Sequence, residues 1–163
     1  MSSLASDGTD KGLKLGFLKD LHTKYVLSLD KDKESYEYIA SEHLRMSGVY
    51  WGLMAMELMK EGDSMDKEAI VEWVISSQDA ETGGWGGNAG HDTHILYTTS
   101  AVQLLAICNS LPKIDADKVA KYIASLQQED GSFVKVPRDP RPRETDFTHF
   151  NTFYLGQRQV YLM

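Results

Sequence analysis

The sequence has one cysteine, four prolines and no long uninterrupted run of apolar residues. A single cysteine excludes a disulfide within the chain, and Cys108, in the apolar stretch LLAIC, is expected to be a small core residue rather than a nucleophile. No apolar run approaches the roughly 18 residues of a membrane-spanning helix, so we expect no transmembrane segment. The first residues, MSSLASDGTDKG, lack the plan of a signal peptide, which favours a cytoplasmic location.

Positively charged residues are fewer than negatively charged ones, 17 lysines and arginines against 24 aspartates and glutamates. The net charge of −7 argues against nucleic acid or an acidic membrane surface as a partner. Residues 1–134 carry 12 lysines and arginines against 21 acidic residues, whereas residues 135–163 carry 5 against 3 and hold three of the prolines. We therefore predict a flexible N-terminus over residues 1–12, a folded part over residues 13–134 and a divergent Pro/Arg-containing tail over residues 135–163.

One motif occurs in two full copies at a spacing of roughly fifty residues. VEWVISSQDAETGGW covers residues 71–85 and VAKYIASLQQEDGSF covers residues 119–133. Each copy has a helical apolar pattern, then a glutamine, an acidic stretch and a glycine turn that ends in an aromatic residue. A weaker echo, KYVLSL, lies at residues 24–29. Repeats of this period indicate a stacked or circular array.

The apolar spacing between the motifs is helical, and strand signals are weak. One helix face is predicted for Leu15, Leu18, Leu21, Tyr25 and Leu29, and a helix over residues 43–59 is apolar on more than one side and expected to be well buried. Later helices are predicted to start at the N-caps Asp66, Asp92 or Thr93, and Asp115. Such helices alternate between an inner and an outer layer, which gives an α/α toroid if the array closes and a solenoid if it does not.

Three stretches carry a family resemblance: HLRMSGVYWGL at residues 43–53, GGNAGHDTHILYTTSAVQLL at residues 86–105, and the turn at residues 127–133. They resemble the beta subunit of protein prenyltransferases, in particular of the Rab (type II) geranylgeranyltransferase. The resemblance implies an all-α fold, here a partial, truncated α/α toroid with an irregular tail. It also implies transfer of geranylgeranyl from geranylgeranyl diphosphate to C-terminal cysteines of Rab GTPases. The implied partners are an alpha subunit, forming a heterodimer, and a Rab escort protein.

The same resemblance assigns an isoprenoid-binding role to four residues. Ser47, Tyr50 and Trp51 match positions that line the family's apolar funnel, and Tyr97 lies where the next inner helix reaches it. A small Ser47 fits a pocket deep enough for a twenty-carbon chain, whereas Thr99 stands where related sequences usually carry leucine. The alternative is that the three aromatic residues simply belong to the core.

The His91-Asp92-x-His94 cluster has the residue types of a metal site, but its spacing at the start of a helix rarely brings three ligands onto one ion. We interpret Asp92 as a helix cap and the histidines as partners of loop carbonyls. The resemblance implies zinc in the full-length family, bound by an aspartate, a cysteine and a histidine of later repeats that this chain lacks. No catalytic and no metal-binding residue is therefore predicted here.

After Phe133 the repeat register disappears, and we interpret the tail as an alternative exon, a retained intron or a frame change. On that interpretation the chain is marginally stable and inactive alone, because exposed inner helices leave a large apolar surface. The enzymatic hypothesis is a Rab geranylgeranyltransferase beta subunit. The alternative is a truncated, non-catalytic binding or scaffold module. Another toroid family, such as the terpene cyclases, is disfavoured because it should lack the SGVYWGL and HILYT stretches.

Overall fold

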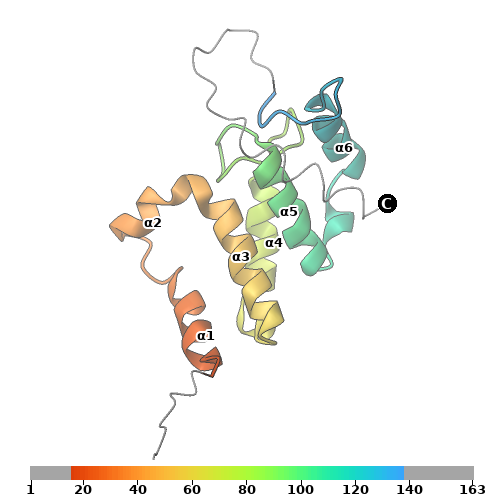
Figure 1. The fold of residues 1–163 in the computed structure, drawn as a ribbon. Coiled ribbons are helices and arrows are strands. Elements are labelled where there is room, and N and C mark those ends of the chain that lie inside the picture. The colour runs from red at the N-terminus through yellow and green to blue at the C-terminus, as the bar shows by residue number, and fades with distance from the viewer. Residues whose placement is uncertain (1–15, 138–163) are drawn as a thin grey trace, which may run out of the picture.

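The computed structural model describes residues 16–137 (Figure 1), so the expectations for residues 1–12, for Leu15 and for the tail beyond residue 137 lie outside it. The α-helices are α1 (Lys19–Ser28), α2 (Tyr36–Ala40), α3 (Arg45–Leu58), α4 (Lys67–Ser76), α5 (Ile95–Ile107) and α6 (Ala116–Ser125). Short 3₁₀ turns are η1 (Glu42–Leu44), η2 (Gly62–Ser64) and η3 (Leu111–Lys113). Between residues 16 and 137 there is no β-strand, and the all-α prediction is confirmed.

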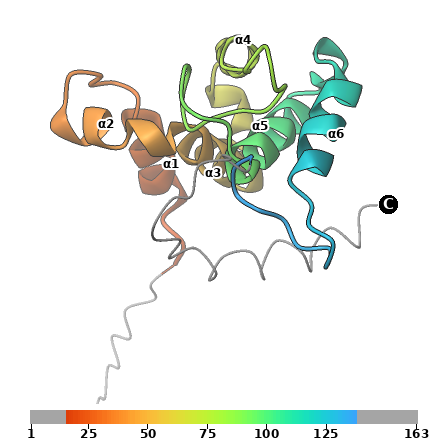
Figure 2. The same ribbon diagram turned by 90° about the horizontal axis from the view of Figure 1, so that it is seen from above.

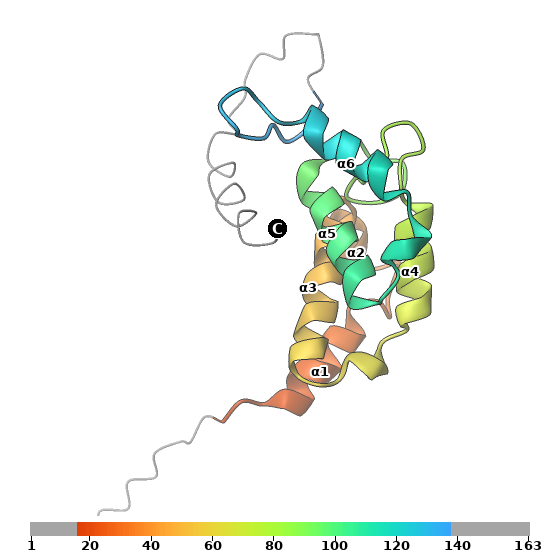
Figure 3. The same ribbon diagram turned by 90° about the vertical axis from the view of Figure 1, so that its right-hand side faces the viewer.

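The helices form two layers around the α3–α5 pair. Helix α3 packs along α5, and α4 packs against α5 from the other layer (Figure 2). Helix α6 crosses near the start of α5 (Figure 3), where Ile95 of α5 is buried with Tyr122 and Leu126. The inner helices are therefore α3 and α5, and the outer helices α4 and α6, as the repeat predicted.

The two helix pairs are built by matching local features 49 residues apart. Asp66 accepts a hydrogen bond from the Ala69 N–H at 2.9 Å, and Asp115 accepts one from the Lys118 N–H at 3.0 Å, so both predicted N-caps are confirmed. After each inner helix one residue takes the left-handed conformation, Lys60 with φ 61° and Asn109 with φ 53°. This conformation ends the helix with a turn that pairs its last carbonyls.

Each outer helix ends in the same kind of turn. Gln78 pairs with Trp85 in an isolated antiparallel bridge, and Gln127 pairs with Phe133 in the same way. The second turn is one residue shorter than the first. The turn aromatics Trp85 and Phe133 are therefore 48 residues apart, whereas the glutamines Gln78 and Gln127 and the N-caps Asp66 and Asp115 are 49 residues apart.

The core lies between the inner helices and α4. It consists of fully or almost fully buried side chains, namely Met46, Tyr50, Leu53, Val71, Val74, Trp85, Ala101, Leu104, Leu105 and Val119. Cys108 packs against this core and is half-buried, and burial raises the pKa of its thiol. A raised pKa leaves the thiol protonated and unreactive, in agreement with a packing role.

Two apolar faces of the described chain are exposed to solvent. Helix α1 has no buried residue, and the face predicted from Leu18, Leu21, Tyr25 and Leu29 points to solvent. The side of α1 that contacts α3 carries Val26, which lies against Gly52, and the Lys19 ammonium pairs at 2.7 Å with the carboxylate of Glu61, which follows the end of α3. Periodicity identifies an apolar face, but it does not say whether a partner covers that face.

Helix α3 is likewise less enclosed than predicted. It starts at Arg45, after the 3₁₀ turn η1, and its buried residues Met46, Leu53 and Met56 face one direction. Trp51 and Leu58 are 65% and 78% exposed, respectively. The expectation that α3 is buried on more than one side is therefore wrong, because within the described chain α5 and α1 cover only part of its surface.

Candidate functional site

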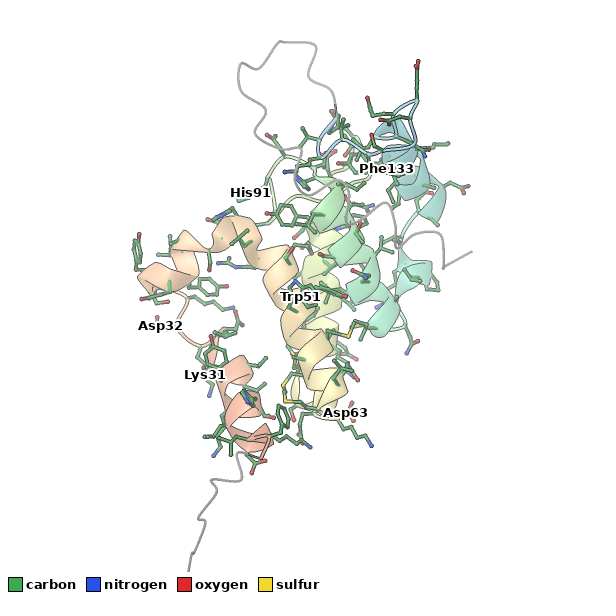
Figure 4. All side chains as sticks on the ribbon, viewed as in Figure 1. Lys31, Asp32, Trp51, Asp63, His91 and Phe133 are labelled. Atoms are coloured by element: carbon green, nitrogen blue, oxygen red, sulfur yellow. The ribbon has the colours of Figure 1, made fainter. Side chains whose placement is uncertain are left out.

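Trp51, labelled in Figure 4, is one of several exposed apolar side chains that form a stripe along α3 and the residue before it. Leu44 is the last residue of η1, directly before α3. Leu44, Trp51 and Leu58 are spaced by seven residues, which within α3 places Trp51 and Leu58 on one face of the helix. Gly48 and Ala55 fill the intermediate positions. An ideal Cβ built on Gly48 would meet no atom within 4 Å, so the surface beside the Trp51 ring is open. We call Leu44, Gly48, Trp51, Ala55 and Leu58 the α3 stripe.

Ser47 and Tyr50 border the α3 stripe without lying on it. Ser47 is half-buried, and its buried Oγ has no hydrogen-bond partner within the described residues. Tyr50 is 9% exposed and belongs to the core, while its ring centroid lies 5.0 Å from that of Trp51 at a tilt of 59°. The Tyr50 ring thus packs against the Trp51 ring at a tilt, and Trp51 supplies the exposed aromatic surface.

Tyr97 lies in a separate, open hollow of about 460 Å³ at the N-terminal ends of the inner helices. The hollow is lined by His43, Gly87, Gly90, His91, Asp92, His94, Tyr97 and Val136. Tyr97 is half-buried, and burial raises the pKa of its hydroxyl. Of the four predicted site residues, the three on α3 are therefore contiguous, and the fourth faces a neighbouring hollow.

The glycine-containing loop at residues 86–91 lies at the edge of the hollow, against the start of α3. The Gly87 carbonyl accepts a hydrogen bond from the Met46 N–H at 2.8 Å, and an added Cβ on Gly87 would overlap the backbone of His43. The Asn88 amide donates to the Glu42 carboxylate at 2.9 Å. Glycine is needed at position 87 because the loop backbone must approach this closely.

The second turn repeats this contact on the next inner helix. The Lys135 carbonyl accepts a hydrogen bond from the Ile95 N–H at 2.9 Å. Gly87 and Lys135 both stand two residues after the aromatic residue of their turn. Each turn therefore caps an inner helix that precedes it in sequence. This role was not predicted, although the fixed offset from Trp85 and Phe133 is visible in the sequence.

The expected role of Asp92 or Thr93 as the cap of α5 is wrong. The cap is His94, whose Nδ1 accepts the Leu96 N–H at 3.0 Å. The interpretation of the two histidines as partners of loop carbonyls is also wrong. The His94 ring accepts a hydrogen bond from a backbone amide, and the His91 Nε2 lies 3.8 Å from the Glu42 carboxylate. The His94 backbone N–H donates to the Trp85 carbonyl at 2.9 Å, and α5 begins after it, at Ile95.

His94 also supports Tyr97, since their ring centroids lie 5.3 Å apart at a tilt of 51°. Burial, assisted by the nearby charge of Lys135, lowers the pKa of the His94 imidazole. A neutral imidazole can accept a hydrogen bond at Nδ1, whereas the imidazolium cannot. The shift therefore favours the protonation state that the cap requires.

The described residues do not form a zinc centre. Between residues 16 and 137 no three histidine, cysteine, aspartate or glutamate side chains converge closely enough to hold a metal ion. A structural or catalytic zinc site needs at least three protein ligands. The arrangement offers instead an apolar binding surface with an adjoining hollow rich in imidazoles.

No helix in the described part of the chain is long and apolar enough to cross a membrane.

A family model described as "Prenyltransferase alpha-alpha toroid domain" matches residues 17–151. This match covers most of the sequence and continues past residue 134, where the repeat region was expected to end.

Several characterised proteins are similar to the chain. It is 43% identical to geranylgeranyl transferase type-2 subunit beta 1 of Arabidopsis thaliana over 60% of this chain and 30% of that protein. It is 38% identical to geranylgeranyl transferase type-2 subunit beta of Saccharomyces cerevisiae over 73% of this chain and 38% of that protein. A probable counterpart from Caenorhabditis elegans is 49% identical over 57% of this chain and 28% of that protein. The matches thus span about a third of these relatives.

Proposed function

The chain belongs to the prenyltransferase alpha-alpha toroid family, and from that premise we propose that it supplies the isoprenoid-binding wall of a Rab (type II) geranylgeranyltransferase beta subunit. In this proposal Trp51 contacts the isoprenoid, Tyr50 supports Trp51, and Ser47 leaves depth beside it. Tyr97 contributes from the adjoining inner helix. The reaction of the whole protein is transfer of geranylgeranyl from its diphosphate to C-terminal cysteines of Rab GTPases.

One observation carries the proposal: the α3 stripe is exposed, apolar and mounted on a packed core. Trp51 is 65% exposed, while the core residues Met46 and Leu53 of the same helix are fully buried. Apolar surface that is held rigidly is typical of a ligand site, because the ligand does not have to order it. The names of the similar proteins indicate a geranylgeranyl group as the ligand.

The remaining components belong to the whole protein rather than to the described residues. When bound, zinc in this family activates the acceptor thiol as a thiolate. Since residues 16–137 do not form a metal centre, no step of the reaction is assigned to them. An alpha subunit, a Rab escort protein and a cytoplasmic location are parts of the proposal, as is a repeat region ending near residue 134.

The proposal is tested by titrating the full chain with a fluorescent analogue of geranylgeranyl diphosphate. We expect Trp51→Ala to weaken binding about tenfold, the effect of losing most of one large apolar contact. Leu21→Ala, which removes an exposed apolar side chain of α1, is the matched control and should leave the affinity unchanged. Equal affinities for wild type and Trp51→Ala would contradict an isoprenoid role for the α3 stripe.

A second candidate function is a non-catalytic binding module. The exposed apolar residues of α1 favour it, because large apolar patches on soluble proteins usually mark interaction sites. A type-2 alpha subunit is the partner to test. If that subunit co-elutes with the full chain while the isoprenoid analogue does not bind, the module is favoured over the isoprenoid wall.

A further inference from the structure

Tyr97 has the position on α5 that Gly48 has on α3. A left-handed residue follows each inner helix, Lys60 after α3 and Asn109 after α5, and these two residues are 49 residues apart. Gly48 and Tyr97 are separated by the same number of residues, and Gly48 belongs to the α3 stripe. Tyr97 therefore stands on the face of α5 that corresponds to the α3 stripe, and the direction of its ring affects the ligand surface there.

The imidazole of His94 makes two contacts that bear on this ring. Its Nδ1 accepts a hydrogen bond from the Leu96 N–H at 3.0 Å, which fixes the imidazole at the start of α5. The fixed imidazole lies against the Tyr97 ring, with the ring centroids 5.3 Å apart. Within residues 16–137, His94 supplies the one aromatic ring that packs against Tyr97. The cap of α5 and the orientation of Tyr97 are therefore linked through one side chain.

The link depends on a neutral imidazole. An imidazolium carries a proton on both ring nitrogens, so it cannot accept a hydrogen bond from the Leu96 N–H. A positive charge is also unfavourable at the N-terminus of a helix, where the aligned peptide dipoles already place positive charge. Protonation of His94 is therefore expected to break the cap and to free the imidazole from its place against Tyr97.

The surroundings of His94 favour the neutral form at neutral pH. Burial, and then the charge of Lys135 in the second turn, lower the pKa of the imidazole. The other titratable side chains of the hollow come from η1, from the loop before α5 and from α5 itself, namely His43, His91, Asp92 and Tyr97. Of these, the Asp92 carboxylate favours an imidazolium, but it is exposed and its field is screened by solvent. His94 should therefore gain its proton only below about pH 6.5, the pKa of an unperturbed histidine.

We propose that His94 is a positioning residue of the isoprenoid surface: its neutral imidazole holds the Tyr97 ring at the hollow, and its protonation releases the ring and weakens isoprenoid binding. The inference rests on the proposed function, in which Tyr97 contacts the isoprenoid. His94 acts through Tyr97 and not by contact with the ligand. The binding surface is then complete at neutral pH and loses one of its aromatic members in mild acid.

Nuclear magnetic resonance of the full chain tests the contact without a ligand. The ring signals of Tyr97, assigned by their loss in Tyr97→Phe, are followed as the pH is lowered. We expect a single titration with a midpoint below about pH 6.5 in wild type. It should be absent in His94→Asn, which keeps a capping side chain that does not titrate. Tyr97 signals that do not titrate in wild type, or that titrate equally in His94→Asn, overturn the proposal.

His91→Asn is the matched control for this measurement. It removes another imidazole that lines the same hollow, but His91 lies near Glu42 and neither caps α5 nor packs against Tyr97. The titration of the Tyr97 signals should persist in this variant. If the titration disappears with His91 and persists without His94, the wrong histidine has been assigned and the proposal is overturned.

A titration with the fluorescent analogue of geranylgeranyl diphosphate tests the effect on binding. We expect wild type to bind about fivefold more weakly once His94 is protonated, the factor that corresponds to the loss of one helix cap. The same titration of His94→Asn shows how much of the pH dependence belongs to the diphosphate itself. An equal pH dependence in both proteins overturns the proposal.

The two measurements separate this inference from the proposed function. If the Tyr97 signals follow His94 and the affinity falls with them, both are supported. If the Tyr97 signals follow His94 but the analogue binds at no pH, the coupling of the two rings stands and the proposed function fails. If the analogue binds with an affinity that the protonation of His94 does not change, the proposed function stands and the positioning role is refuted.

Discussion

Helices α1 and α3 both expose apolar side chains to solvent, yet they differ in what supports them. Helix α1 has no buried residue, whereas α3 buries Met46, Tyr50, Leu53 and Met56 beneath its exposed stripe. At its start α1 has no side-chain cap, while the start of α3 is held by the Gly87 carbonyl. The two helices therefore expose similar apolar side chains, but only α3 also anchors itself in the core.

The difference teaches that exposed apolar area alone does not define a binding site. A ligand gains most from a surface whose side chains are already fixed, because ordering them costs free energy on binding. The Tyr50 ring and the core fix Trp51 of α3, and within the described chain no such support lies beneath Tyr25 of α1. We accordingly propose α3 as the ligand surface and α1 as a surface for a protein partner.

The largest effect is expected from removing the support of α3. Trp85 is fully buried, and its indole N–H donates to the Val74 carbonyl at 2.7 Å. Trp85→Ala should lower the free energy of unfolding by about 3–5 kcal/mol, measured by urea titration. Amide exchange in α3 should accelerate strongly, while exchange in α1 changes little. A uniform acceleration across both helices would break the comparison.

A matched pair of leucines compares the two helices directly. Leu53→Ala empties a fully buried site of α3 and should cost about 2–5 kcal/mol. Leu21→Ala shortens an exposed side chain of α1 and should change the free energy of unfolding by no more than about 0.5 kcal/mol. Equal costs in the same urea titration would show that the exposed face of α1 is covered in solution.

Helix caps provide a smaller contrast. Asp66→Ala and Asp115→Ala each remove an N-cap hydrogen bond and should cost about 1 kcal/mol. The N-cap residue of α1 is Leu18, whose side chain makes no capping hydrogen bond. Leu18→Ser should supply that hydrogen bond and slow amide exchange in α1. If the two aspartate variants differ widely in urea titration, the structural equivalence of the two repeats does not extend to their energetics.

The smallest effect concerns pH. Burial lowers the pKa of His94, so its contribution to stability is complete above the pKa of an unfolded histidine, about 6.5. That contribution is lost as the pH falls through the lowered folded-state pKa. His94→Asn keeps a capping side chain that does not titrate, and should flatten the dependence of unfolding free energy on pH below about 6.5. Identical slopes for the two proteins would contradict the cap.

Much of the fold followed from local pattern. The caps Asp66 and Asp115, the glycine turns and the all-α class were predictable because each rests on short-range chemistry. The exposed face of α1 was not predictable, since amphipathic spacing does not reveal whether a neighbour is present. The His94 cap was not predicted for a similar reason: the His94 N–H donates to the carbonyl of Trp85, nine residues upstream, and α5 begins only at Ile95.

The candidate site was predictable only in part. The family resemblance directed attention to Ser47, Tyr50, Trp51 and Tyr97, but it did not distinguish Tyr50, which is buried, from Trp51, which is exposed. That distinction depends on the rotation of α3 about its axis, which packing against α5 and α1 determines. Whether these residues bind an isoprenoid stays a prediction.

The central claim is that the supported stripe of α3, and not the face of α1, is the isoprenoid surface. Nuclear magnetic resonance of the full chain during titration with geranylgeranyl diphosphate tests it most directly, because signals of Trp51 and Tyr25 are followed in one sample. We predict that the Trp51 indole signal shifts in a saturable manner while the Tyr25 ring signals stay unchanged. A saturable shift at Tyr25 with an unchanged Trp51 signal would contradict the account.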